Sequence, residues 1–343
     1  MSMIPLSRSA FRPKLQDRID DYLCLSPAQS LTVGIYKDGA LYVLGDPEAE
    51  NGLLYDIGSI SKTFTAHLIL KLCDERKLEL DKTVDRYLPL KKGNYPTLYQ
   101  LLTHTAGYHH ITPAEVTVPA LLLHRYANKN PYESCSVKTV ADCLSRRREI
   151  KTVSRYGYSD FAYAVLASVA EQAAETPFAD LLEEFIRKDL GLKSTVLEAD
   201  PVKRFPLSAK GKKIPPFWVW KRGNPYIAAG GTVTNVDDML RYVALQIESD
   251  LPYIKNAHNI CEESAVKKDN HLMCIGWHTY KRSNQLWHVG GVGTFRSSII
   301  FNKKRRLGVV VLGNSKGKSS ANVHYLAKMI YSELKINKID LQK

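Results

Sequence analysis

Residues 53–73, with the sequence LLYDIGSISKTFTAHLILKLC, change from a short apolar run to a helical pattern at Ser59. Ser59 and Lys62 stand three residues apart at this boundary. On a helix such positions share a face, so the Lys62 amine can lie against the Ser59 hydroxyl. A helix N-terminus carries a partial positive charge, which stabilises an oxyanion and disfavours a charged lysine. The stretch predicts a nucleophile and its base, with a capping serine and a surface lysine as the alternative.

The S-x-x-K spacing alone is weak evidence. It occurs again at Ser264/Lys267, Ser315/Lys318 and Ser332/Lys335. Only Ser59 follows an apolar strand-like run that ends in a glycine, Gly58, and begins a long helical pattern. Its context therefore distinguishes Ser59 from the other serines.

Patterns on both sides of this stretch indicate the fold. An apolar stripe through Leu15, Ile19 and Leu23 predicts an N-terminal helix, and Asp38-Gly39 between two β-rich runs predicts a hairpin. Helical patterns dominate from Ser59 to about residue 222, strands are expected at 272–281 and 286–312, and a last helix follows. We expect an α+β fold, in which an antiparallel sheet is flanked by N- and C-terminal helices and holds an inserted, mostly helical region. The expected organisation is a single module over 1–343, with a sheet region at 1–58 and 225–343 and a helical region at 59–224.

Composition limits the classes of protein. A chain of 343 residues with 44% hydrophobic content can bury one large core or two smaller ones. It has no run of 18 apolar residues, and residues 1–20 lack the apolar segment of a secretory signal, so we expect a soluble, cytoplasmic protein without a membrane span. The six cysteines form no CxxC pair and are expected to be reduced thiols, and we expect no metal and no cofactor.

The net charge of +13 is partly clustered, in Arg146–Arg148, Lys210–Lys213 and Lys303–Arg306. Such clusters are found in nucleic-acid-binding surfaces, but they are also typical of solvated loops on a basic protein. The last cluster lies between two apolar runs and reads as a hairpin turn, which favours solvated loops. We therefore expect no specific nucleic-acid partner and a small molecule or short peptide as the substrate.

Two further residues could take part in chemistry. Tyr158, in YSDFAYAVL at the start of a helical pattern, could relay a proton to a leaving group if nearby cations favoured its phenolate. His288, in WHVGGVGTF, is followed by Gly290 and Gly291, which allow close approach of a backbone or substrate. The alternatives are a buried tyrosine with a bonded hydroxyl and a histidine that ends a strand before a turn.

Taken together, these motifs resemble the serine β-lactamase and penicillin-binding-protein-like hydrolases, in particular the class C-like branch with D,D-carboxypeptidases, D-aminopeptidases and carboxylesterases. The resemblance covers roughly residues 30 to 315 and rests on five matches in the family's order: DIGSISKTFTA, LLTHTAGY, YSDFAYAVL, AAGGTVTNVDDMLRY and WHVGGVGTF.

The resemblance implies a role for each matching residue. Ser59 would be the nucleophile, Lys62 its base or base partner, and Tyr158 the proton shuttle. The backbone amides of Ser59 and Gly291 would form the oxyanion hole. Gly291 is the second residue of the glycine pair Gly290-Gly291. His288 would stand where many relatives have the lysine of K-T-G.

Two departures from the family pattern bear on function. Asp160 occupies a place where relatives usually have asparagine, and a carboxylate there favours a protonated Lys62. The H-x-G form at His288 resembles D-peptidases and some esterases more than class C β-lactamases.

We therefore expect a serine hydrolase that cleaves an amide or ester, with D-amino-acid peptides or amides as the favoured substrates. A carboxylesterase, an acyltransferase and a weak β-lactamase of the same fold remain alternatives. A catalytically silent penicillin-binding-like regulatory or binding protein is an alternative of another class. The acyl group, the leaving group and the oligomeric state are open at this point.

Overall fold

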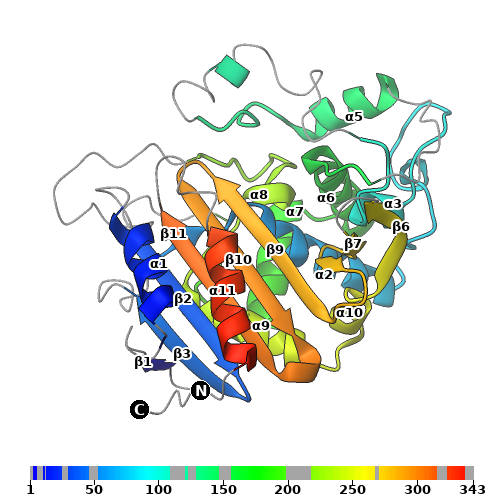
Figure 1. Ribbon diagram of the computed structural model, residues 1–343. Helices are drawn as coiled ribbons and strands as arrows, with labels where there is room; N and C mark the ends of the chain where they lie inside the picture. Colours follow the sequence, from blue (N-terminus) through cyan, green and yellow to red (C-terminus); the bar gives the residue numbers. More distant parts are fainter. Residues whose placement is uncertain are drawn as a thin grey trace.

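A nine-stranded sheet forms the centre of the described part of the chain (Figure 1). The computed structural model describes residues 3–5, 11, 13–24, 30–45, 53–108, 120–122, 129–146, 156–197, 218–266, 270–314 and 323–336. The strand order is β1-β3-β2-β11-β10-β9-β8-β7-β6, and neighbours are antiparallel except for the parallel pair β1 and β3. The strands are β1 (Met3–Pro5), β2 (Ser30–Lys37), β3 (Ala40–Gly45), β6 (Ile260–Val266), β7 (His271–Cys274), β8 (His278–Tyr280), β9 (Gln285–Val292), β10 (Phe295–Asn302) and β11 (Leu307–Asn314).

Helices cover both faces of this sheet (Figure 1). On one face, α1 (Pro13–Cys24) and α11 (Val323–Ile336) pack on β2 and β11 and enclose a core of their own. The other face carries the larger core. Its helices are α2 (Ser61–Asp74), α3 (Leu98–Leu102), α5 (Val137–Arg146), α6 (Asp160–Ala174), α7 (Phe178–Glu184), α8 (Ile227–Gly230), α9 (Val236–Glu248) and α10 (Pro252–Asn256). A π-helical turn, Phe185–Asp189, continues α7, and a small ribbon pairs β4 (Tyr55–Asp56) with β5 (Val233–Thr234).

The predicted fold class is confirmed: the protein is α+β, with an antiparallel sheet flanked by terminal helices. Strand β2 pairs along its whole length with β11, so the two ends of the chain meet in the middle of the sheet. Both expected hairpins are present. Asp38 and Gly39 have φ of 50° and 94°, which the turn between two right-twisted strands requires. The Lys303–Arg305 turn joins β10 to β11, whereas 147–155 and 198–217, which hold most of the other two basic clusters, lie outside the described residues.

Two edge strands were not predicted from the sequence. β1 has only three residues, and β6 has a register shift against β7. Short, charged or irregular strands are typical of sheet edges, where they limit pairing with other chains. Such strands lack the apolar alternation on which sequence prediction depends.

Helix α2 lies in the middle of the larger core. Its residues from Ser61 to Leu70 are all buried, including Lys62. The hydroxyl of Tyr242 in α9 donates to Thr63 Oγ1 at 2.8 Å and lies 2.9 Å from His67 Nδ1, so α2 is fixed by polar as well as apolar contacts. In the described part of the chain, no helix is long and apolar enough to cross a membrane.

Candidate active site

Ser59 lies in a tight 3-10 turn, Gly58–Ile60, that connects β4 to the N-terminus of α2. Gly58 has φ of 51°, a conformation that glycine adopts without strain. The turn leaves Ser59 half-buried although both of its neighbours are buried. The chain thus presents the Ser59 hydroxyl at the surface of the larger core.

Strand β9 approaches this turn closely because it has two glycines there. A Cβ on Gly58 would lie 2.6 Å from the Gly291 nitrogen, and a Cβ on Gly290 would lie 1.8 Å from the Ile57 carbonyl oxygen. The Ser297 hydroxyl donates to the same Ile57 oxygen at 2.8 Å and fastens the turn to β10. The Gly291 amide therefore lies beside the Ser59 turn, as an oxyanion hole built from these two residues requires.

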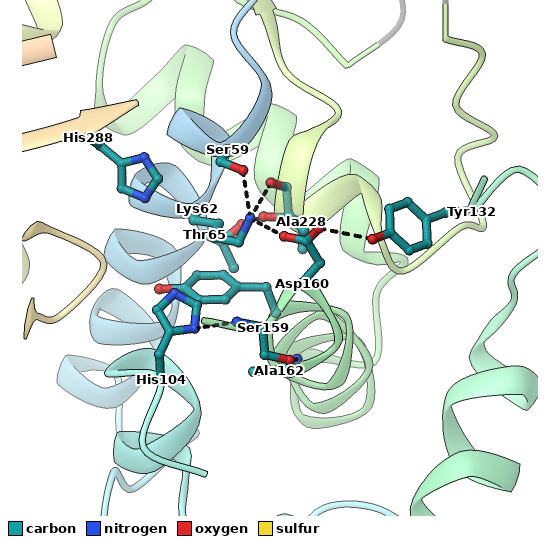
Figure 2. A network of polar contacts seen from close by, with 12 residues as sticks. Ser59, Lys62, Thr65, His104, Tyr132, Ser159, Asp160, Ala162, Ala228 and His288 are labelled. Atoms are coloured by element: carbon teal, nitrogen blue, oxygen red, sulfur yellow. Dashed lines mark hydrogen bonds and ion pairs between the residues drawn. The ribbon is translucent and has the colours of Figure 1, made fainter. Parts of the chain in front are cut away.

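Lys62 is fully buried, and within the described residues its ammonium contacts three oxygens (Figure 2). It donates to Ser59 Oγ at 3.1 Å and to the Ala229 carbonyl oxygen at 2.8 Å, and it forms an ion pair with Asp160 Oδ1 at 2.6 Å. An ammonium has three hydrogens, so these oxygens match its full donor set. The structure brings Ser59, Lys62 and Asp160 together.

Two opposing effects act on the pKa of Lys62. Burial disfavours the charged amine and lowers its pKa, whereas the charge and the hydrogen bond of Asp160 raise it. Burial is the larger effect, so the pKa of Lys62 falls below its ordinary value. The carboxylate expected to keep Lys62 protonated is in contact with it, but burial outweighs its influence.

Asp160 is held in place from two sides. It is the first residue of α6, whose N-cap Ser159 accepts a hydrogen bond from the Ala162 amide at 3.1 Å. Its second oxygen, Oδ2, accepts a hydrogen bond from the Tyr132 hydroxyl at 3.0 Å (Figure 2). The Tyr132 ring stacks on Tyr226 with a centroid distance of 4.2 Å, which fixes the position of the hydroxyl. Sequence reasoning missed Tyr132, because it lies 28 residues before Asp160 in a segment without a helical or strand pattern.

Tyr158 lies over Lys62, with the amine 4.9 Å from its ring centroid. Burial raises the pKa of Tyr158 well above its ordinary value, the charge of Asp160 adds to this, and a hydrogen bond with Ser59 lowers it. The sequence interpretation depended on cations that would favour the phenolate, and the structure gives the opposite direction. Tyr158 is a protonated phenol, which suits a donor of a proton to a leaving group.

His104 supports the segment that carries Tyr158. Its Nδ1 accepts a hydrogen bond from the Ser159 amide at 3.2 Å, and its ring lies 4.4 Å from the Tyr158 ring between centroids. His104 belongs to LLTHTAGY, one of the five motifs that match the family, for which the sequence predicted no role. The motif was therefore the available signal for this residue.

His288 on β9 is buried and uncharged. Burial, together with the positive charge of Lys62, lowers its pKa to about 3. Its Nδ1 lies 2.8 Å from the Val289 carbonyl oxygen, which can only accept a hydrogen bond, so the proton is on Nδ1. At neutral pH His288 therefore offers no positive charge at the place where the resemblance puts a lysine.

Two cavities meet at Ser59. The first has a volume of about 370 Å³ and includes Tyr132, Asp160, Trp218, Trp220 and Gly291 in its lining. The second has a volume of about 610 Å³ and is lined mainly by rings, among them Tyr156, Tyr158, His278, Trp287 and His288. A substrate bond placed at Ser59 can thus extend one side into each cavity.

The family model described as Beta-lactamase matches residues 24–330. The chain belongs to the β-lactamase family. Among curated proteins it is similar to Protein flp of Staphylococcus aureus (strain MW2), at 23% identity over 293 residues, which are 80% of this chain and 54% of that protein. The chain therefore spans about half the length of that relative.

Solved structures show the same fold. The octameric penicillin-binding protein homologue from Pyrococcus abyssi has a TM-score of 0.76 at 22% identity, over 95% of this chain and 78% of that one. The β-lactamase/D-alanine carboxypeptidase from Pseudomonas syringae has a TM-score of 0.74 at 17% identity, over 94% of this chain and 98% of that one. The predicted family resemblance is confirmed, and family membership is consistent with serine hydrolase activity.

Proposed function

We propose that this protein is a serine hydrolase that forms an acyl-enzyme on Ser59 and cleaves an amide or ester, with D-amino-acid peptides or amides as the favoured substrates. The observation that carries the proposal is the Lys62 amine, buried and 3.1 Å from the Ser59 hydroxyl, at a turn that adjoins two cavities. A buried amine with a lowered pKa can accept the serine proton.

The proposed reaction begins when Ser59 Oγ bonds to the carbonyl carbon and its proton passes to the neutral Lys62 amine. The amides of Ser59 and Gly291 donate to the oxyanion that forms. When the bond to the leaving group breaks, the Tyr158 hydroxyl donates its proton to the departing nitrogen or oxygen and regains one from the Lys62 ammonium. Water then attacks the acyl-enzyme, releases the acid and restores Ser59. An alcohol or amine in place of water would make the same residues an acyltransferase.

One observation favours a second function. The Lys62 ion pair with Asp160, at 2.6 Å, stabilises the charged amine, which cannot act as a base. If that state prevails, the protein keeps the cavities and the fold but acts as a catalytically silent binding or regulatory protein.

A labelling experiment separates these functions. Wild type, Ser59→Ala and Ser332→Ala are treated with a fluorophosphonate probe and with a fluorescent penicillin. Ser332 is the matched control, because it has the same S-x-x-K spacing but lies exposed on α11. We expect labelling of wild type and Ser332→Ala and none of Ser59→Ala. Absence of labelling by both probes would favour the silent protein, and labelling of Ser59→Ala would refute the assignment of the nucleophile.

A further inference from the structure

Two buried asparagines fix the backbone around Tyr132. The Tyr132 amide donates to Asn130 Oδ1 at 2.9 Å, and the Tyr132 carbonyl oxygen accepts a hydrogen bond from Asn224 Nδ2. Asn224 Oδ1 also accepts from the amide of Tyr226, whose ring lies at 10° to the Tyr132 ring. Buried amides cost free energy unless they are hydrogen-bonded, and these contacts provide the bonds. The Tyr132 side chain is therefore held in a defined direction.

The Tyr132 hydroxyl is the outer end of a chain of polar contacts that runs to Ser59 (Figure 2). It donates to Asp160 Oδ2 at 3.0 Å, Asp160 Oδ1 lies 2.6 Å from the Lys62 amine, and that amine lies 3.1 Å from Ser59 Oγ. A carboxylate only accepts hydrogen bonds, so each of its two oxygens needs a donor. Here Tyr132 and Lys62 share the negative charge of one group.

The other titratable groups around Lys62 carry no charge at neutral pH. The ring centroids of Tyr158 and Tyr163 lie 4.9 Å and 5.6 Å from the amine, and burial raises the pKa of both hydroxyls well above the ordinary value. His288 is neutral because burial lowers its pKa to about 3. In the described part of the chain, the charged group in contact with Lys62 is therefore Asp160.

We propose that Tyr132 is a positioning residue that acts through Asp160 and favours the neutral, proton-accepting form of Lys62. While Lys62 is an ammonium, it neutralises much of the charge of the carboxylate, so the hydrogen bond from Tyr132 is weak. When Lys62 loses its proton, the carboxylate keeps its full charge, and the same hydrogen bond becomes a strong, charge-assisted one. The hydroxyl thus stabilises the deprotonated pair more than the protonated pair. The inference rests on the proposed function and adds how the base stays available beside an aspartate.

The test compares the pH dependence of acylation in wild type and Tyr132→Phe, which removes one oxygen and keeps the ring that stacks on Tyr226. The assay is the second-order rate of fluorophosphonate labelling. The acid limb should move to higher pH by about 0.5 to 1 unit, which makes labelling about 3- to 10-fold slower on the limb and leaves it equal above the limb. Tyr95→Phe is the matched control, and its profile should equal that of wild type. Tyr95 is also buried and its hydroxyl donates to the Lys91 carbonyl oxygen at 2.8 Å, but it lines neither cavity.

A second pair of variants shows whether Tyr132 acts through the carboxylate. In an Asp160→Asn background, Tyr132→Phe should leave the acid limb in place, since no negative charge remains for the hydroxyl to stabilise. A limb that moves as far in this background as in wild type would overturn the route through Asp160. A uniform loss of rate at all pH values with an unchanged limb would mean that Tyr132 only supports the local structure, which also overturns the proposal, as does a limb that moves to lower pH.

A direct titration separates this proposal from the proposed function. In protein with ¹³C-labelled lysine, the Cε signal of Lys62 reports its protonation without any reaction, and the signal is assigned by its absence in Lys62→Met. Its titration midpoint should rise by about 0.5 to 1 pH unit in Tyr132→Phe. An unchanged midpoint would overturn the proposal even where wild type is labelled. Absence of labelling in wild type, together with a higher midpoint in Tyr132→Phe, would contradict the hydrolase and leave the role of Tyr132 established.

Discussion

The ion pair between Lys62 and Asp160 leads to a prediction about how the acylation of Ser59 depends on pH. Asp160→Asn removes the negative charge. Its amide oxygen can still accept a hydrogen bond from Lys62, and its amide nitrogen can hydrogen-bond to the Tyr132 hydroxyl. A base works only when it is deprotonated, so acylation of Ser59 rises with pH through the pKa of Lys62. Asp160 raises that pKa. The acid limb of the pH profile should therefore move to lower pH in the variant, and the rate at pH 7 should be maintained or increased.

The size of the effect follows from the geometry. The two charged atoms are 2.6 Å apart in a buried setting. Unit charges 2.6 Å apart interact by at most about 6 kcal/mol at an effective dielectric constant of about 20, and about 1.4 kcal/mol corresponds to one pH unit. Carboxylates beside a cation change its pKa by about 1 to 3 units, which agrees with this limit. We expect the acid limb to move down by about 1 to 3 pH units.

The assay is the second-order rate of fluorophosphonate labelling between pH 4 and pH 10, which needs no knowledge of the natural substrate. Asp142→Asn is the matched control. Asp142 forms an ion pair with Lys138 at 2.7 Å, and this pair is exposed on the surface of α5. Exposed pairs contribute about 0 to 1 kcal/mol, so its profile should equal that of wild type. A limb that stays in place or moves to higher pH in Asp160→Asn would refute the view that Lys62 is the base and that Asp160 opposes its deprotonation.

Two further predictions concern the proton shuttle and the turn. Tyr158→Phe should slow acylation by an alkyl ester about 10²- to 10⁴-fold. The loss should be smaller for a 4-nitrophenyl ester, because its leaving group needs no proton. Equal losses for the two esters in single-turnover measurements would contradict the role of Tyr158 as a proton shuttle. Gly290→Ala should lower the free energy of unfolding by about 1 to 3 kcal/mol or more, because its Cβ would lie 1.8 Å from the Ile57 oxygen. Gly223→Ala, whose Cβ has no atom within 4 Å, should change it by less than about 0.5 kcal/mol, and similar melting temperatures for the two variants would argue against the close approach of β9.

Local patterns in the sequence were sufficient for much of the fold. The Asp38-Gly39 hairpin depends on two adjacent residues that accept positive φ, and helix α2 depends on a continuous helical pattern. The edge strands β1 and β6 escaped prediction, because their pairing depends on neighbours that are distant in the sequence rather than on their own alternation.

The residues of the candidate site also divide into those that local sequence determines and those that distant packing brings together. Ser59 and Lys62 are three residues apart at a helix start, so their contact is a local property that the sequence alone determined. Tyr158 at a helix start and His288 before a glycine pair were candidates from their local sequence, and the resemblance to a family implied their roles. Tyr132 was not a candidate, since no motif marks it and only the packing of distant segments brings it to Asp160.

What the sequence could not give was the state of the charges. A lysine, an aspartate and a histidine have pKa values that depend on how completely water is removed from them and on which charges lie nearby. Both quantities are set by the assembled core: burial lowers the pKa of Lys62 despite its contact with Asp160, and burial keeps His288 neutral. The sequence determined which groups stand at the start of α2, and the tertiary structure decided in which direction burial and neighbouring charges move their pKa values.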